Sequence, residues 1–69
     1  MTKKLEEGEA IFRAPDRMGV CTVDIESKPE LKLAICFDTD GEIENFAITI
    51  AKARRLIREL TTLCCNLEN

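Results

Sequence analysis

The sequence predicts an α+β fold of two layers, a four-stranded antiparallel β-meander covered on one face by a single C-terminal helix (ββββα). Two patterns carry this prediction. Apolar residues occupy every second position in short segments that end at Pro- or Gly-containing breaks, and from about Ile50 they recur at spacings of three and four. With 69 residues the chain forms one domain. We expect residues 1–8 to fray, 9–49 to form the meander and 50–67 the helix.

Four segments have strand character, and short connections between them favour antiparallel neighbours. The cleanest alternation places Leu31, Leu33, Ile35 and Phe37 on one face. The turn 38–41 contains Gly at a position that needs a positive φ. Ile43 falls out of phase with Phe46 and Ile48, which suggests a β-bulge near residues 44–45. The predicted strands are 9–14, 20–27, 31–37 and 42–49.

The predicted helix has an apolar stripe, and Thr49 is its predicted N-cap. The stripe is wide enough for a helix that lies on a sheet, and its members are Ala53, Leu56, Ile57, Leu60, Leu63, Cys64 and Leu67. We expect it to cover the sheet face made by Phe12, Val23, Ile25, Leu33, Ile35, Phe46 and Ile48.

Composition excludes several classes of function. The chain has no histidine, so His-based catalytic triads and His metal sites are excluded. Its net charge of −3 disfavours general nucleic-acid or membrane-surface binding. The N-terminus lacks the apolar core of a secretory signal, and no apolar run approaches the ~20 residues needed to span a bilayer. We therefore expect a cytoplasmic protein that does not enter the membrane.

The four cysteines lack the spacing of a zinc site, and we expect no metal and no cofactor. Strand alternation places Cys21 and Cys36 on opposite faces of the predicted sheet. Cys64 lies on the helix stripe, and Cys65 is rotated about 100° away from it. The main interpretation is that the thiols stay reduced and act as small apolar side chains. A redox role through Cys65 is the alternative.

Residues 38–44 carry a short acidic cluster of Asp38, Asp40, Glu42 and Glu44. A calcium loop of the EF-hand type needs glycine at its sixth position, whereas Gly41 is only the fourth residue counted from Asp38. We interpret the cluster as solvated side chains on a hairpin, with a cation site as the alternative. No phosphate-binding loop or activated nucleophile is visible, and the chain is not expected to be an enzyme.

Two surfaces are candidates for binding. A basic patch of Lys52, Arg54, Arg55 and Arg58 lies at the start of the helix, and it faces either an acidic protein or phosphates. Residues 50–69 carry a net charge of +2, and residues 1–49 carry −5. The second surface is the sheet face that the helix leaves open. Its small apolar centre suits a homodimer or partner interface, formed by Ile11, Val20, Ala34, Cys36 and Ala47.

The order of strands followed by a C-terminal helix resembles, in topology, the core of the PC4-like transcriptional coactivators, which bind single strands as dimers. The aromatic and basic strand motifs of that family are missing here, so the resemblance assigns no residues. We expect a small, non-enzymatic, homodimeric interaction protein that binds another protein as an accessory factor or inhibitor. A tiny acidic chain is also typical of inhibitors used by viruses and mobile elements. The alternatives are a nucleic-acid-associated module that uses the basic patch and a thiol-based redox or metal protein.

Overall fold

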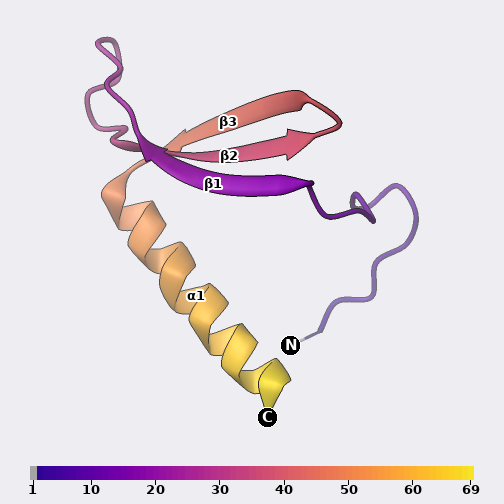
Figure 1. Ribbon diagram of the computed structural model, residues 1–69. Coiled ribbons are helices and arrows are strands. Elements are labelled where there is room, and N and C mark those ends of the chain that lie inside the picture. The colour runs from indigo at the N-terminus through magenta and orange to yellow at the C-terminus, as the bar shows by residue number, and fades with distance from the viewer. Residues whose placement is uncertain (1) are drawn as a thin grey trace.

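The computed structural model describes residues 2–69, which form three strands and one helix. Strand β1 spans Arg17–Thr22, β2 spans Leu33–Thr39 and β3 spans Glu42–Ile48. Helix α1 spans Ile50–Glu68 and follows β3 after a single residue. The strands form one antiparallel sheet in the order β1-β2-β3, with α1 below one face (Figure 1). The α+β class and the antiparallel sheet are therefore confirmed.

A two-residue turn joins β2 to β3, as the sequence predicts. Asp40 and Gly41 both have positive φ values, 54° and 84°, which is the requirement of a type I′ hairpin turn. The Gly41 amide also donates a hydrogen bond to Asp38 Oδ1 at 3.1 Å. The turn fixes a register in which Thr39 pairs with Glu42 and Leu33 with Ile48. This ladder is continuous, so the bulge expected near residues 44–45 is wrong.

The fourth strand is also wrong, because residues 9–14 lie outside the sheet. Their one ladder-like feature is an isolated bridge between Glu7 and Ala10. Pro15 follows directly and offers no amide to continue a ladder. The hydrogen bond from the Asp16 amide to the Asp38 carbonyl, at 2.8 Å, comes immediately before β1 begins. Ile11 consequently stays 90% exposed.

The first strand of the sheet lies earlier than predicted. It begins at Arg17, inside the segment interpreted as a break, and ends at Thr22 rather than residue 27. Val23 and Ile25 therefore lie in the connection to β2, where they are half-buried. Gly19 is accommodated inside the strand, and a Cβ atom added there would meet no atom within 4 Å.

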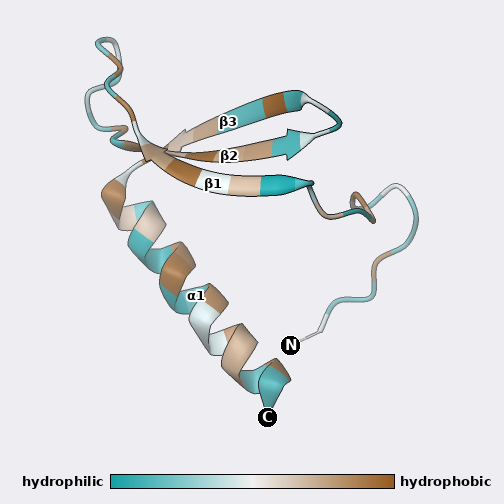
Figure 2. Ribbon diagram, viewed as in Figure 1, coloured by the Kyte–Doolittle hydropathy of each residue, from teal (hydrophilic) through white to brown (hydrophobic). Residues whose placement is uncertain are grey.

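Helix α1 begins as predicted. Thr49 has an extended conformation, and its hydroxyl accepts a hydrogen bond from the Lys52 amide at 3.2 Å. Nineteen residues give a helix about 28 Å long. Apolar and polar residues alternate along it as brown and teal bands (Figure 2). The helix diverges from the sheet along its length (Figure 1), so it does not cover the sheet face as the sequence suggested.

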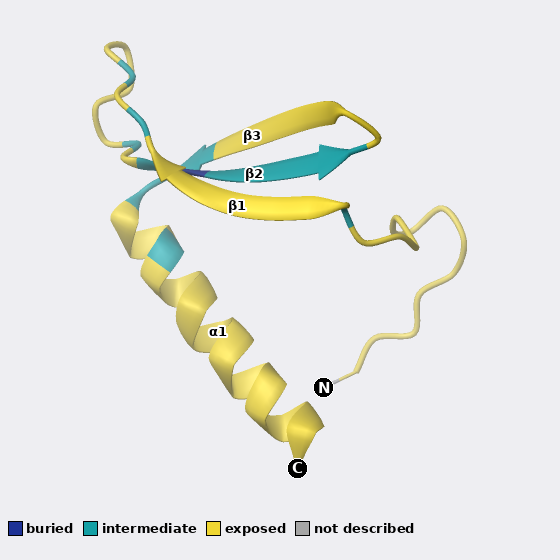
Figure 3. Cartoon of the chain, viewed as in Figure 1, coloured by how far each residue is buried: buried dark blue, intermediate teal, exposed yellow. Residues whose placement is uncertain are grey.

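The chain buries very little of itself. Ala34, 2% exposed, is the only buried residue of the described chain, and most of the fold other than β2 is exposed (Figure 3). The accessible surface is 6545 Å², whereas a compact monomer of this mass has about 4,400 Å². The radius of gyration is 14.6 Å, against about 11 Å for a compact domain of this length. The three strands and the helix are formed, but the described residues do not enclose a hydrophobic core.

Candidate interaction surface

One face of the sheet is strongly apolar, because the register aligns large side chains across all three strands. Val20 pairs with Ile35, and Ile35 pairs with Phe46. Phe37 and Phe46 pack edge to face, with ring centroids 5.9 Å apart. Residues paired in this way lie on the same side of a sheet. Thr22 and Glu44 share this side as the pairing partners of Leu33 and Phe37. The apolar residues of the face, called here the apolar face, are Met18, Val20, Leu33, Ile35, Phe37, Phe46 and Ile48.

This face and the helix stripe form the two walls of an apolar groove of about 640 Å³. The lining contains no charged side chain, and it joins part of the sheet face to the first half of the stripe. The groove residues are Met18, Gly19, Val20, Leu33, Ala34, Ile35, Phe37, Ile48, Ala53, Leu56, Ile57 and Leu60. An open groove with only apolar walls is a surface that water solvates poorly and that another apolar surface can cover.

The helix stripe continues beyond the groove. Leu63 and Leu67 lie one and two turns past Leu60, and none of the three is covered. Leu60 is 53% exposed and Leu67 is 85% exposed. The second half of α1 thus presents an apolar stripe with nothing packed against it.

The residues predicted to form one interface on the sheet do not all lie on the same face. Ala34, Cys36 and Ala47 do share one face, because Cys21 pairs with Ala34 and Ala34 pairs with Ala47. Val20 belongs to the opposite, groove-lining face, so its predicted placement is wrong. Ile11 lies outside the sheet altogether. The face with Ala34 also carries Asn45 and Asp38, the partners of Cys36 and Ile43, so it is less apolar than the face opposite. Ala34 is in the middle strand and contributes to the groove lining as well.

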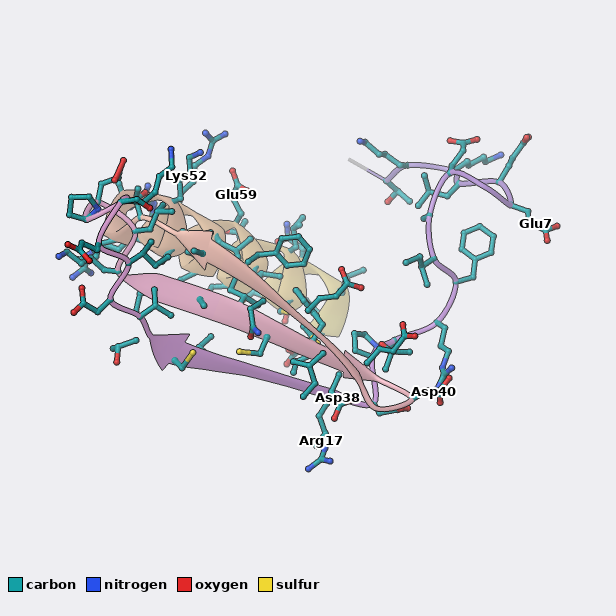
Figure 4. The ribbon with its side chains drawn as sticks, turned by 90° about the horizontal axis from the view of Figure 1, so that it is seen from above. Glu7, Arg17, Asp38, Asp40, Lys52 and Glu59 are labelled. Carbon is teal, nitrogen blue, oxygen red and sulfur yellow. The ribbon has the colours of Figure 1, made fainter. Side chains whose placement is uncertain are left out.

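The basic patch is exposed on α1, outside the groove. Lys52, Arg54, Arg55 and Arg58 are all exposed. Arg55 Nε donates a hydrogen bond to Glu59 at 3.0 Å, one turn further along the helix. Lys52 and Glu59 project from the helix at a distance from the hairpin residues Asp38 and Asp40 (Figure 4). The patch is therefore separate from the acidic cluster.

The acidic hairpin is held by arginines. Arg13 donates hydrogen bonds to Asp40 and Asp16, with closest distances of 2.8 and 3.0 Å, and Arg17 lies 3.5 Å from Asp38. The hydrogen bond from Arg13 lowers the pKa of the Asp40 carboxyl, and the same bond raises the pKa of Arg13. These contacts tie the N-terminal segment to the β2–β3 turn. Among the described residues, no group of three or more potential ligands is placed to hold a metal ion.

The positions and exposure of the cysteines differ from those predicted. Cys21 and Cys36 lie on the same sheet face, and their Sγ atoms are 3.9 Å apart. The sequence places Cys64 on the apolar stripe and Cys65 off it, which predicts that only Cys65 is exposed, whereas both are exposed on α1. None of the four is in a disulfide.

No protein-family model, curated protein or solved structure matches the chain. The one helix of the described chain, α1, is not long and apolar enough to cross a membrane.

Proposed function

We propose that the chain is a non-enzymatic protein-interaction module that acts as a homodimer and binds an acidic partner protein. The observation that carries this proposal is the apolar groove, which is open along its length, while residues 2–69 contain one buried residue. A chain of this size normally buries about 60% of its unfolded surface to offset the entropy of folding. A second protein surface supplies the burial that one copy lacks.

The excess surface has the size of a dimer interface. The accessible area exceeds that of a compact monomer by roughly 2,000 Å². Permanent homodimers bury about 2,000–5,000 Å² in total, or half of that per chain. Part of the excess belongs to residues 2–16, which lie outside the sheet. The groove and the helix stripe contribute another part, because Val20, Ile57, Leu60, Leu63 and Leu67 are all at least half exposed.

We assign the groove to helix α1 of a second copy. The stripe beyond Leu60 is apolar, uncharged and the right shape to pack between a sheet and another helix. In a two-fold arrangement each copy gives its stripe to the other's groove, and both surfaces are covered at once. Because each groove is covered by the other copy's stripe, two copies complete the contact. Neither groove is then left open for a third copy.

In such a dimer the basic patch lies outside the dimer contact and is free to bind the acidic target protein. It lies on the helix surface away from the groove, and a two-fold dimer carries two copies of the patch with four basic residues each. An acidic protein surface complements it, and charge of this kind increases association rate and selectivity. The protein then has two surfaces with separate roles, an apolar one for its own copy and a basic one for its target. This arrangement supports an accessory or inhibitory role.

Nucleic-acid association is the second candidate, favoured by the absence of any acidic residue from the first turn of α1. Single-strand binders add aromatic rings on which bases stack. Phe37 and Phe46 are on the sheet face that lines the groove, away from the basic patch. We therefore rank an acidic protein above a nucleic acid as the target. A cytoplasmic location is also part of the proposal, supported by four unbridged cysteines.

The patch is tested by reversing two of its charges. The double variant Arg54→Glu/Arg58→Glu is expected to weaken binding of a labelled acidic peptide, such as a poly-glutamate chain, by at least about tenfold. Lys3→Glu/Lys4→Glu makes the same change in net charge outside the patch and should leave binding nearly unchanged. Fluorescence anisotropy measures both.

A single-stranded oligonucleotide provides the competing probe in the same assay. Tighter binding of the oligonucleotide than of the acidic peptide, with a steep linear fall of log affinity against log salt, indicates phosphate contacts. That result replaces the acidic protein by a nucleic acid as the target. Equal loss in the two double variants contradicts a localised binding patch.

A further inference from the structure

Two thiols meet on the sheet face opposite the groove. The Sγ atoms of Cys21 in β1 and Cys36 in β2 are 3.9 Å apart, in van der Waals contact. Cys21 is exposed and Cys36 is half-buried, so reagents reach the pair from solvent. The two residues are 15 positions apart in the sequence, and only the fold brings them together.

The register explains why the sulfur atoms approach each other. Cys21 is directly opposite Ala34, and Cys36 is directly opposite Gly19, so the two cysteines are diagonal neighbours. Gly19 has no side chain, and the space that a Cβ atom would enter there is empty. The Cys36 side chain therefore has room to turn across β1 toward Cys21. A larger residue at position 19 would fill the space beside Cys36.

We propose that Cys21 and Cys36 form a redox-active thiol pair that is converted to an intrachain disulfide by a small-molecule disulfide such as oxidised glutathione. The Cys21 thiolate attacks one sulfur of glutathione disulfide, forms a mixed disulfide and releases one glutathione thiolate. The Cys36 thiol then loses its proton and attacks the Cys21 sulfur, which releases the second glutathione. The protein loses two electrons and two protons, and one disulfide becomes two thiols.

The environment of each thiol sets the order of these steps. Partial burial raises the pKa of Cys36, and the neighbouring Cys21 thiol raises it further. Cys36 is thus a poor first nucleophile, and the more accessible Cys21 reacts first. Once Cys21 is in a mixed disulfide, Cys36 is already beside it and acts as the resolving thiol.

The same geometry makes the bond reversible. Diagonal neighbours in an antiparallel sheet are about 7–8 Å apart, whereas the Cα atoms of most disulfides lie within about 6.8 Å. Closing the bond therefore requires β1 and β2 to shift relative to each other, and a disulfide strained in this way is more easily reduced than a structural one. This property suits a redox-responsive link in a compartment where glutathione normally keeps thiols reduced.

Mass spectrometry tests the pair directly. The folded protein is equilibrated with glutathione buffers of increasing oxidised fraction, quenched by alkylation and digested. We expect a species that has lost two hydrogen atoms, with a peptide cross-link between Cys21 and Cys36 that excess reduced glutathione reverses. The Cys36→Ser variant should instead accumulate one glutathione on Cys21, because the resolving thiol is gone.

Two controls keep the outcome decisive. Cys64→Ser/Cys65→Ser removes the other thiols and should leave the link unchanged. Urea-unfolded protein should lose the preference for Cys21–Cys36, because only the fold brings them together. Cross-links that join two chains or involve the helix cysteines, or two stable glutathione adducts on Cys21 and Cys36, overturn the proposal. None of these outcomes depends on the oligomeric state, so the pair and the dimer are tested separately.

Discussion

Leu60→Glu is expected to convert the protein from a dimer to a monomer with lower helix content. Leu60 lies at the end of the groove lining, and in the proposed dimer this is where the stripe passes from the chain's own sheet to that of the second copy. An unpaired buried charge costs about 3–5 kcal/mol, and the two-fold axis places two of them in the interface. The dissociation constant should rise by at least about a hundredfold. Sedimentation and circular dichroism measure the two effects.

Thr62→Glu is the matched control for this substitution. Residue 62 follows Leu60 by two positions and therefore lies on the opposite side of α1. It receives the same charge on the same helix but outside the stripe, and the dimer should persist. Loss of association in both variants points to a general charge effect. No change in Leu60→Glu means that the half-exposed leucine contacts nothing in solution.

Ile35→Ala is expected to lower the free energy of unfolding by about 2–5 kcal/mol, the range for a side chain in a closed core. Ile35 occupies the middle strand, between Val20 and Phe46, at the centre of the apolar face. In an open monomer the same truncation removes few contacts, because the groove above Ile35 is filled with water. The size of the loss therefore reports whether the groove is covered.

Urea unfolding at one fixed protein concentration measures this loss, since the stability of a dimer depends on concentration. Lys32→Ala is the control, an exposed residue just before β2 whose truncation should cost under about 0.5 kcal/mol. Similar costs at positions 32 and 35 contradict a covered groove.

Local signals predicted the hairpin and the helix well. The Asp40-Gly41 turn and the Thr49 cap depend on residues close in sequence, and their chemistry is specific. Strand phase in β1 was harder, because apolar residues occupy both alternations. Cys21, Val23 and Ile25 suggested one phase, but the strand ends at Thr22, and Val20 faces the groove instead. A shift of one residue exchanges the faces of a strand.

The candidate site was predicted only in its parts. The sequence identified the helix stripe and most of the apolar sheet face, yet not that they form an open groove. The angle between them depends on the single residue, Thr49, that connects β3 to α1. The proximity of Cys21 and Cys36 was missed for the same reason as Val20, since it requires the register of β1 on β2.

The solution mass of the unmodified chain tests the central claim most directly. Light scattering coupled to size exclusion, performed under reducing conditions so that no interchain disulfide contributes, measures it at micromolar concentration. The proposed helix-in-groove dimer predicts twice the chain mass of 7.8 kDa. A mass of 7.8 kDa that persists as the concentration is raised contradicts the dimer and leaves the groove open to a different protein.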